Sequence, residues 1–70
     1  MTGTVKSVLT RVLSEELGRQ AQWLEDDKKM GFDITPRTKV IDELHKFMEE
    51  NDIKVRDDYY FDAFHQYMHR

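Results

Sequence analysis

The chain contains no cysteine, a single proline and only three glycines among its 70 residues. Without cysteine it can form neither a disulfide nor a thiolate metal site, two of the usual ways of stabilising a small domain. No apolar run approaches the length of a membrane-spanning helix, and no charged-then-apolar leader precedes a cleavage-like site. We therefore expect a cytoplasmic protein that makes no contact with a membrane.

Basic charge is not concentrated anywhere in the chain. The formal net charge is −3, and the excess of acidic side chains falls in residues 33–52. Nonspecific binding to nucleic acid relies on a dense basic patch that neutralises phosphates and releases counterions. Because no such patch is visible, we do not expect nucleic acid to be the main partner.

Length and composition indicate one small folded domain over residues 1–70. Hydrophobic residues make up 39% and charged residues 36% of the chain, and the apolar residues are regularly spaced. A core of this size rarely supplies more than about 3–5 kcal/mol of stability. Dense helix packing or oligomerisation is then the expected remedy, and a homodimer is the natural hypothesis.

A long amphipathic helix is predicted over residues 4–30. Apolar side chains recur at three- and four-residue spacings there, the pattern of one helix face: Val5, Val8, Leu9, Val12, Leu13, Leu17, Ala21 and Leu24. Gly18 is an interior weakness that costs about 1 kcal/mol relative to alanine. Gly31 is well placed for a left-handed C-cap that ends the helix.

Two shorter helices are predicted over residues 36–51 and 57–69. Thr35 should cap the second helix, because Pro36 suits its first position, and Asp57 should cap the third. The apolar stripe of the second helix is made of Val40, Ile41, Leu44, Phe47 and Met48. Short connections make sequential helices antiparallel neighbours. The predicted fold is all-α: a compact three-helix domain with two shorter helices packed back on a long first one.

The last helix carries five of the eight aromatic residues of the chain. Its Tyr and Phe side chains either complete the core or form a surface for a partner, since such residues are enriched at interfaces. Tyr59 lies off the stripe of the last helix and Trp23 at the edge of its own, so both are candidate exposed anchors. The predicted partner-binding set is Trp23, Tyr59, Tyr60, Phe64 and Tyr67, with Glu49 and Glu50 at the rim.

The opposite face of the last helix holds the only candidates for metal chemistry. His65 and His69 stand four residues apart, so two imidazoles could meet one ion, and Asp62 precedes them by one turn. The sequence between the histidines offers no glutamate base, and a solvated helix face explains the pattern equally well. We expect no cofactor or metal, with Asp62, His65 and His69 as weak candidates.

Enzymatic activity is not expected. No nucleophile elbow, oxyanion loop or phosphate-binding glycine loop is present, and His45 lies at the edge of a helix stripe like an ordinary boundary residue.

A small sequence-specific transcriptional regulator is the alternative. Thr35, Arg37, Thr38 and Lys39 place basic and hydroxyl groups at a helix N-terminus, where helix-turn-helix proteins read bases. The acidic exposed side of the same helix would repel phosphates, and the basic footprint of such proteins is missing.

The sequence therefore favours a helical module for protein–protein interaction. We find no close resemblance to a family in particular residues. Small helical proteins without cysteine are common among phage and mobile-element accessory factors, an analogy of size and style only. The expected role is that of an inhibitor, adaptor or anti-activator that binds a host or regulatory protein through aromatic side chains.

Overall fold

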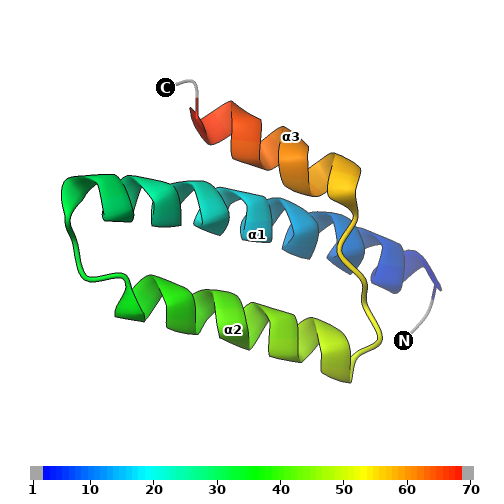
Figure 1. The fold of residues 1–70 in the computed structure, drawn as a ribbon. Helices are drawn as coiled ribbons and strands as arrows, with labels where there is room; N and C mark the ends of the chain where they lie inside the picture. The colour runs from blue at the N-terminus through cyan, green and yellow to red at the C-terminus, as the bar shows by residue number, and fades with distance from the viewer. Residues whose placement is uncertain (1–2, 69–70) are drawn as a thin grey trace.

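A long central helix organises the fold, and two shorter helices pack on it separately (Figure 1). The computed structural model describes the backbone of residues 3–68 and the side chains of residues 3–66. The helices are α1 (Gly3–Met30), α2 (Thr35–Glu50) and α3 (Asp57–Met68). The described residues contain no strand. The all-α prediction with three helices is confirmed. The first helix begins one residue earlier than predicted, and the second begins and ends one residue earlier. The predicted end of the third helix, residue 69, lies outside the described residues.

The turn between α1 and α2 is fixed by a glycine with positive φ. Gly31 has φ of 75°, and the N–H of Phe32 donates to the carbonyl of Asp27 at 2.9 Å. This pairing satisfies carbonyls that the helix end leaves without partners. The predicted glycine C-cap is confirmed, and α2 consequently runs back antiparallel to α1 (Figure 1).

The start of α2 differs from its prediction. Thr35 is already the first helical residue, and Ile34 occupies the N-cap position without a side-chain hydrogen bond. The carboxylate of Asp33 accepts from the N–H of Thr35 at 3.0 Å, so the aspartate does the work predicted for the threonine. This hydrogen bond holds the pKa of Asp33 below its ordinary value of 3.8.

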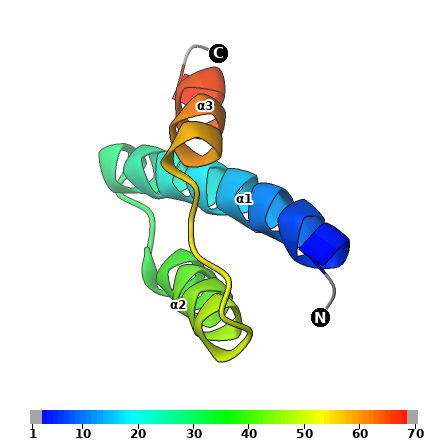
Figure 2. The same ribbon diagram turned by 90° about the vertical axis from the view of Figure 1, so that its right-hand side faces the viewer.

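The expectation that sequential helices are neighbours is wrong for α2 and α3. Residues 51–56 cross one side of α1, and α3 then packs on a different side of it from α2 (Figure 2). Within the described residues, α2 and α3 make no contact with each other. The crossing begins at Asp52, whose φ of 53° is unusual for a residue with a Cβ, and the N–H of Ile53 donates to the carbonyl of Met48 at 2.8 Å.

The core lies between α1, α2 and the crossing segment. Leu17, Met48 and Ile53 are its buried cluster, and they are surrounded by partly buried apolar side chains: Leu9, Leu13, Ile41, Leu44, Val55 and Tyr60. Burial of these groups supplies the main favourable free energy of the fold. The core is small, which fits the marginal stability expected of a short chain.

The α1–α3 interface is a close crossing of small residues. Gly18 is buried against the backbone of α3, so that a Cβ built there would lie 2.2 Å from the carbonyl oxygen of Tyr60. Buried Ala63 faces it from α3. Ser14 is fully buried one turn earlier, and its Oγ accepts the N–H of Arg56 at 2.9 Å where α3 begins. Gly18 is thus a packing requirement, and its description as a mere weakness of the helix is corrected.

Candidate interaction surface

The residues predicted to bind a partner do not gather on one surface. Trp23 contacts the start of α2, where the guanidinium of Arg37 lies 5.2 Å from the centre of the indole ring. Tyr59 lies against the first turns of α1, in a shallow hollow that Gly3, Ser7 and Thr10 also line. With a rise of 1.5 Å per residue, these two places on α1 are about 20 Å or more apart.

The aromatic residues of α3 divide between docking and exposure. The rings of Tyr60 and Phe64 are half-buried and stacked at 6.4 Å, and Tyr60 packs against the core cluster. Phe61 is 51% exposed, although the sequence pattern placed it on the same stripe. It lies edge-on to the ring of Tyr60 and stacks on His65. Tyr67 belongs to α3, but its side chain lies outside the described residues.

The tyrosine anchor is held by a neighbouring arginine. The guanidinium of Arg56 lies 5.3 Å from the ring centre of Tyr59 and pairs with the carboxylate of Asp58 at 2.9 Å. Desolvation raises the pKa of Asp58, but hydrogen bonds from Arg56 and from the N–H of Tyr59 outweigh it, and the pKa lies below 3.8. Tyr59 is half-buried, and its ring is contacted by Arg56, which precedes the first residue of α3.

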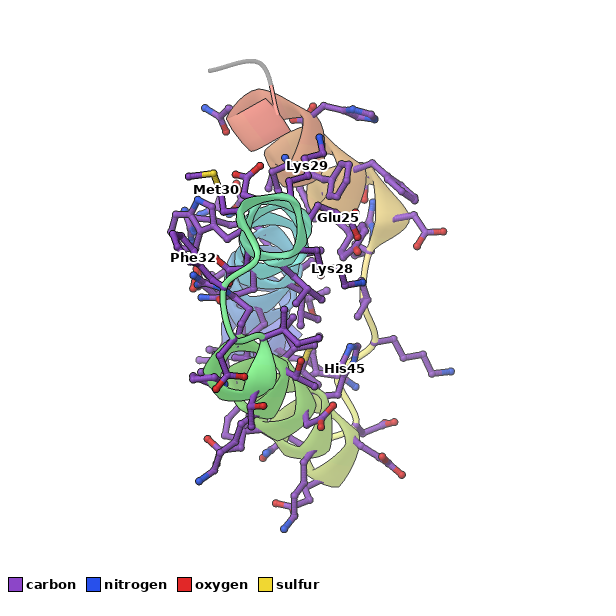
Figure 3. The ribbon with its side chains drawn as sticks, turned by 60° about the vertical axis from the view of Figure 1, so that its left-hand side comes forward. Glu25, Lys28, Lys29, Met30, Phe32 and His45 are labelled. Atoms are coloured by element: carbon purple, nitrogen blue, oxygen red, sulfur yellow. The ribbon has the colours of Figure 1, made fainter. Side chains whose placement is uncertain are left out.

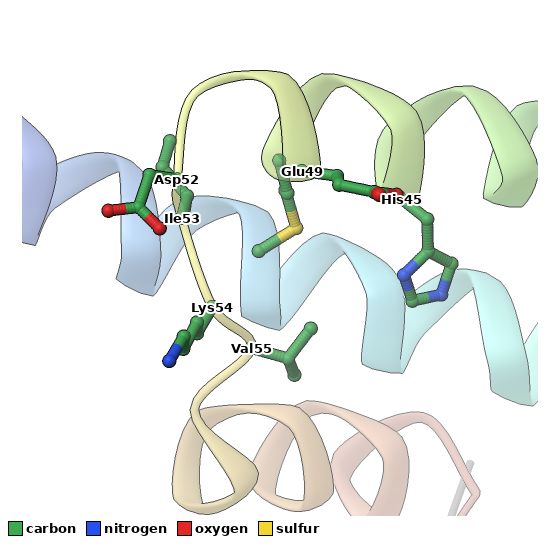
Figure 4. Close-up of a pocket in the computed structure, with 7 residues that line it drawn as sticks. His45, Glu49, Asp52, Ile53, Lys54 and Val55 are labelled. Atoms are coloured by element: carbon green, nitrogen blue, oxygen red, sulfur yellow. The ribbon is translucent and has the colours of Figure 1, made fainter.

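The rim residues of the prediction lie at the far end of α2. Glu49 and Glu50 are both exposed, beside the crossing segment and far from Trp23, which contacts the other end of α2. Glu49 and His45 border a small open hollow of about 290 Å³ whose floor includes Met48 and Ile53 (Figure 4). His45 stands at one end of this hollow, and Asp52 and Lys54 stand at the other. The polar side chains that border this hollow are therefore separated and do not converge on one point.

The basic residue central to the DNA-binding alternative is engaged inside the protein. Arg37 donates to Asp27 at 3.0 Å and to Gln20 at 3.0 Å, while its guanidinium covers Trp23. Thr35, Thr38 and Lys39 are exposed. A helix N-terminus that recognises bases needs side-chain donors that are free to contact them. Arg37, the strongest donor at the start of α2, already donates to residues of α1.

The weak metal candidates do not form a site within the described residues. Asp62 and His65 are exposed on α3, and the imidazole of His65 packs edge-on to Phe64 with ring centres 5.7 Å apart. His69 lies outside the described residues. In residues 3–66, no group of three histidine or carboxylate side chains is close enough to hold an ion.

A row of exposed apolar side chains on α1 and α2 was not identified from the sequence, which placed its residues on the apolar stripes of the two helices. Val8 of α1 is 49% exposed, and the other members of the row are between 41% and 49% exposed. We call it the apolar strip, and it consists of Val5, Val8 and Val12 on α1 and Val40 and Phe47 on α2. All five belong to the apolar stripes predicted for the first two helices, and the packing of the helices leaves them exposed.

The strip runs along the outer side of the α1–α2 pair, away from the crossing segment. On α2, His45 and Glu49 flank the contact with α1 on the side of the crossing segment, so at 100° per residue Val40 and Phe47 fall on the other flank. On α1, Val12 and Trp23 share a direction at 100° per residue, and the guanidinium of Arg37 covers the ring of Trp23.

The strip continues toward the α1–α2 turn as further exposed apolar groups. Met30 and Phe32 are 68% and 60% exposed. Figure 3 shows both on the side of the molecule opposite to Lys28 and His45. Exposed apolar side chains are normal singly, but a row of them that follows one helix marks an interaction site.

A polar network occupies the middle of this outer side. Glu16 accepts from Arg19 at 2.8 Å and from Gln20 at 2.9 Å, and Gln20 in turn accepts from Arg37. These groups are part-buried, and none of the buried side-chain polar atoms among the described residues lacks a hydrogen-bond partner. The outer side of α1 is thus apolar at both ends and charged at its centre.

Comparison with known proteins finds no match: neither a protein-family model, nor a curated protein, nor a solved structure is similar to this chain. Among the described residues, no helix combines the length and apolar character that crossing a bilayer requires.

Proposed function

We propose that this protein is a module for protein–protein interaction, an accessory inhibitor, adaptor or anti-activator that acts in the cytoplasm without catalysing a reaction. The observation that carries the proposal is the apolar strip, in which four valines and one phenylalanine are left 41–49% exposed by a chain with a very small core. A chain that needs every apolar contact for stability loses free energy by exposing such a row in water.

The shape of the strip suits a helix of the partner. Val12 and its neighbours are exposed on α1, and Val40 and Phe47 are exposed on the adjacent α2. An amphipathic helix laid along two packed helices buries anchors at three- and four-residue spacings, a recurring mode of peptide recognition. Trp23 lies beyond the valines on the same outer side and adds the kind of aromatic anchor that interfaces favour.

Of the two carboxylates proposed for the rim, we keep Glu50. Both are exposed at the end of α2 that follows Phe47, but Glu49 lines the hollow beside the crossing segment, on the flank of α2 away from the apolar strip. Rim charges steer the encounter of two proteins and suppress wrong partners, while contributing little to the lifetime of the complex. Replacing Glu50 by glutamine should therefore slow association and flatten its salt dependence, and Glu49→Gln is the matched control.

The proposal is tested by capture of partners on immobilised protein from a cytosolic extract, with quantitative mass spectrometry. Phe47→Asp should abolish capture of a stoichiometric partner, because a charge would be placed inside the interface. Phe61→Asp is the matched control: it changes an aromatic residue of similar exposure on α3 and should leave capture intact. Loss of capture with Phe61→Asp and not with Phe47→Asp would move the site to α3 and contradict the assignment.

A further inference from the structure

We infer that the occupant of the outer side of α1 is a second copy of this chain, paired antiparallel about a two-fold axis near the middle of α1. This inference rests on the proposed interaction surface and names its partner. It is carried by three observations: the residue pattern along α1, the charges at its centre and the area that the monomer leaves exposed.

The pattern along α1 is complementary to its own reversal. Starting at Val5, the residues of the outer side follow spacings of three and four throughout the helix, the spacing of a helix–helix seam: Val5, Val8, Val12, Glu16, Arg19, Trp23, Asp26 and Met30. Small valines occupy the first half, and the large side chains of Trp23 and Met30 occupy the second. An antiparallel copy therefore sets Val5 against Met30 and Val12 against Trp23, so that small groups meet large ones at these two pairs, while Val8 lies opposite Asp26.

The same register brings opposite charges together at the axis. Glu16 of each copy then faces Arg19 of the other, twice by symmetry. Both side chains are about one-third exposed and pair within their own chain at 2.8 Å. A carboxylate has about four acceptor positions and a guanidinium has five N–H donors. Glu16 can therefore accept a further hydrogen bond, and Arg19 can donate one, while their bond within the chain remains. A parallel pair would instead place Glu16 against Glu16.

The area of the monomer leaves room for such an interface. The surface of the chain is 5102 Å², against about 4,700 Å² for a typical folded monomer of 8.5 kDa. The radius of gyration is 12.8 Å, against about 11 Å for a typical 70-residue domain. A seam along the 28 residues of α1 is about 40 Å long, and a helix diameter of about 10–12 Å gives about 400–500 Å² per copy. Two copies would bury about 800–1,000 Å² along α1, the size of a weak and concentration-dependent interface.

The solution mass of the intact chain is the first test. Sedimentation equilibrium at increasing concentration should give twice 8.5 kDa. Val12→Asp should weaken dimerisation about a hundredfold or more, since it buries a charge opposite Trp23. Val12 is 45% exposed in the single copy, so the variant should keep its helical circular dichroism. Phe61→Asp is the control and should remain dimeric.

Engineered cysteines test the register, which is simple in a chain that has none of its own. The double variant Val5→Cys/Met30→Cys should form disulfide-linked dimers. These positions are about 38 Å apart within one α1, whereas a disulfide needs Cα atoms within about 7 Å, so every bridge must join two chains. Each single variant should stay unlinked, because the axis keeps like positions apart.

Each outcome decides between the inference and the proposed function. A chain that is monomeric at all concentrations overturns the inference. If Phe47→Asp still loses a captured partner in that case, the proposed function stands. A dimer that survives Val12→Asp, or that links through the single Val5→Cys variant, also overturns the inferred arrangement. If neither Val12→Asp nor Phe47→Asp alters mass or capture, the outer surface has no binding role and both proposals fail.

Discussion

Replacing Gly18 by alanine should destabilise the protein, against the ordinary helix preference of the two residues. In an isolated helix the change is favourable by about 1 kcal/mol. Here the added Cβ would lie 2.2 Å from the carbonyl oxygen of Tyr60, and 3.1 Å from both the Cβ of Ala63 and the backbone nitrogen of Phe64. Backbone atoms of a helix cannot turn aside as a flexible side chain can.

The cost follows from the displacement that α3 must undergo. To reach ordinary contact, α3 must move away from α1 by about 1 Å, which opens the packing of Tyr60 and strains the hydrogen bond between Ser14 and Arg56. Overpacking of this kind costs about 1–3 kcal/mol and sometimes more. Since the closest contact is backbone, we expect a cost at the upper end of this range, about 3 kcal/mol. After the helix gain of about 1 kcal/mol is subtracted, about 2 kcal/mol is lost, roughly half of the 3–5 kcal/mol available to a domain this small.

Urea denaturation followed by circular dichroism measures this difference. The midpoint of Gly18→Ala should fall sharply, and its folded baseline should show less helix if α3 detaches. Gly3→Ala is the matched control, because nothing lies within 4 Å of the added Cβ and it should be neutral or slightly stabilising. A Gly18→Ala protein as stable as the native chain would refute the close crossing of α1 and α3.

Three further changes probe the ends and supports of the helices. Asp52→Gly should raise the free energy of unfolding by about 0.5–1 kcal/mol, because glycine adopts the positive φ of this position without strain. Asp52→Val should lower the free energy of unfolding. Urea midpoints measure both changes, and equal midpoints for the two variants would contradict the positive φ at residue 52. Ser14→Ala should cost about 1–3 kcal/mol, because it removes the acceptor of the Arg56 N–H in a fully buried place. Ser7→Ala, at an exposed position of α1, is the control and should be nearly neutral. Because the pKa of Asp33 is lowered in the folded state, its contribution to stability is present above about pH 4 and is lost as the pH falls through the folded pKa. Thermal unfolding at stepped pH should show a shallower acid decline for Asp33→Asn, and an unchanged decline would contradict a role for this carboxylate.

The sequence predicted the helices well because their signals are local. Gly31 indicates a left-handed C-cap, and Pro36 favours the first turn of a helix. The regular spacing of Leu9, Leu13 and Leu17 matches the periodicity of a helix and is visible in the sequence alone. These features depend on residues within one or two turns of each other. The positions of the helix ends therefore follow closely from the order of residues along the chain.

What the sequence could not predict is which side of α1 each partner covers. Val5, Val8 and Val12 carry the same apolar character as Leu9 and Leu13, and a stripe this wide on a helix wheel does not say which part remains exposed. Gly18 and Ser14 determine the side of α1 on which α3 packs, because their small side chains let α3 approach closely. That side of α1 carries few apolar residues, so its hydrophobicity does not indicate a contact. Small residues one turn apart were the signal that could have indicated the crossing.

The separation of α2 and α3 has a consequence for how this protein tolerates change. Each of the two shorter helices contacts α1 and does not contact the other within the described residues. Substitutions far apart and without shared neighbours have nearly independent effects on free energy. Tyr60 of α3 packs against the core cluster that Ile41 of α2 also contacts, so independence is expected at positions away from this cluster. The penalties of Arg37→Ala, which removes contacts with Asp27, Gln20 and Trp23, and of Ala63→Gly, at the residue that faces Gly18, should therefore add to within about 0.5 kcal/mol. In evolutionary terms most positions of the two shorter helices can vary separately, and α1 together with Tyr60 has to satisfy both.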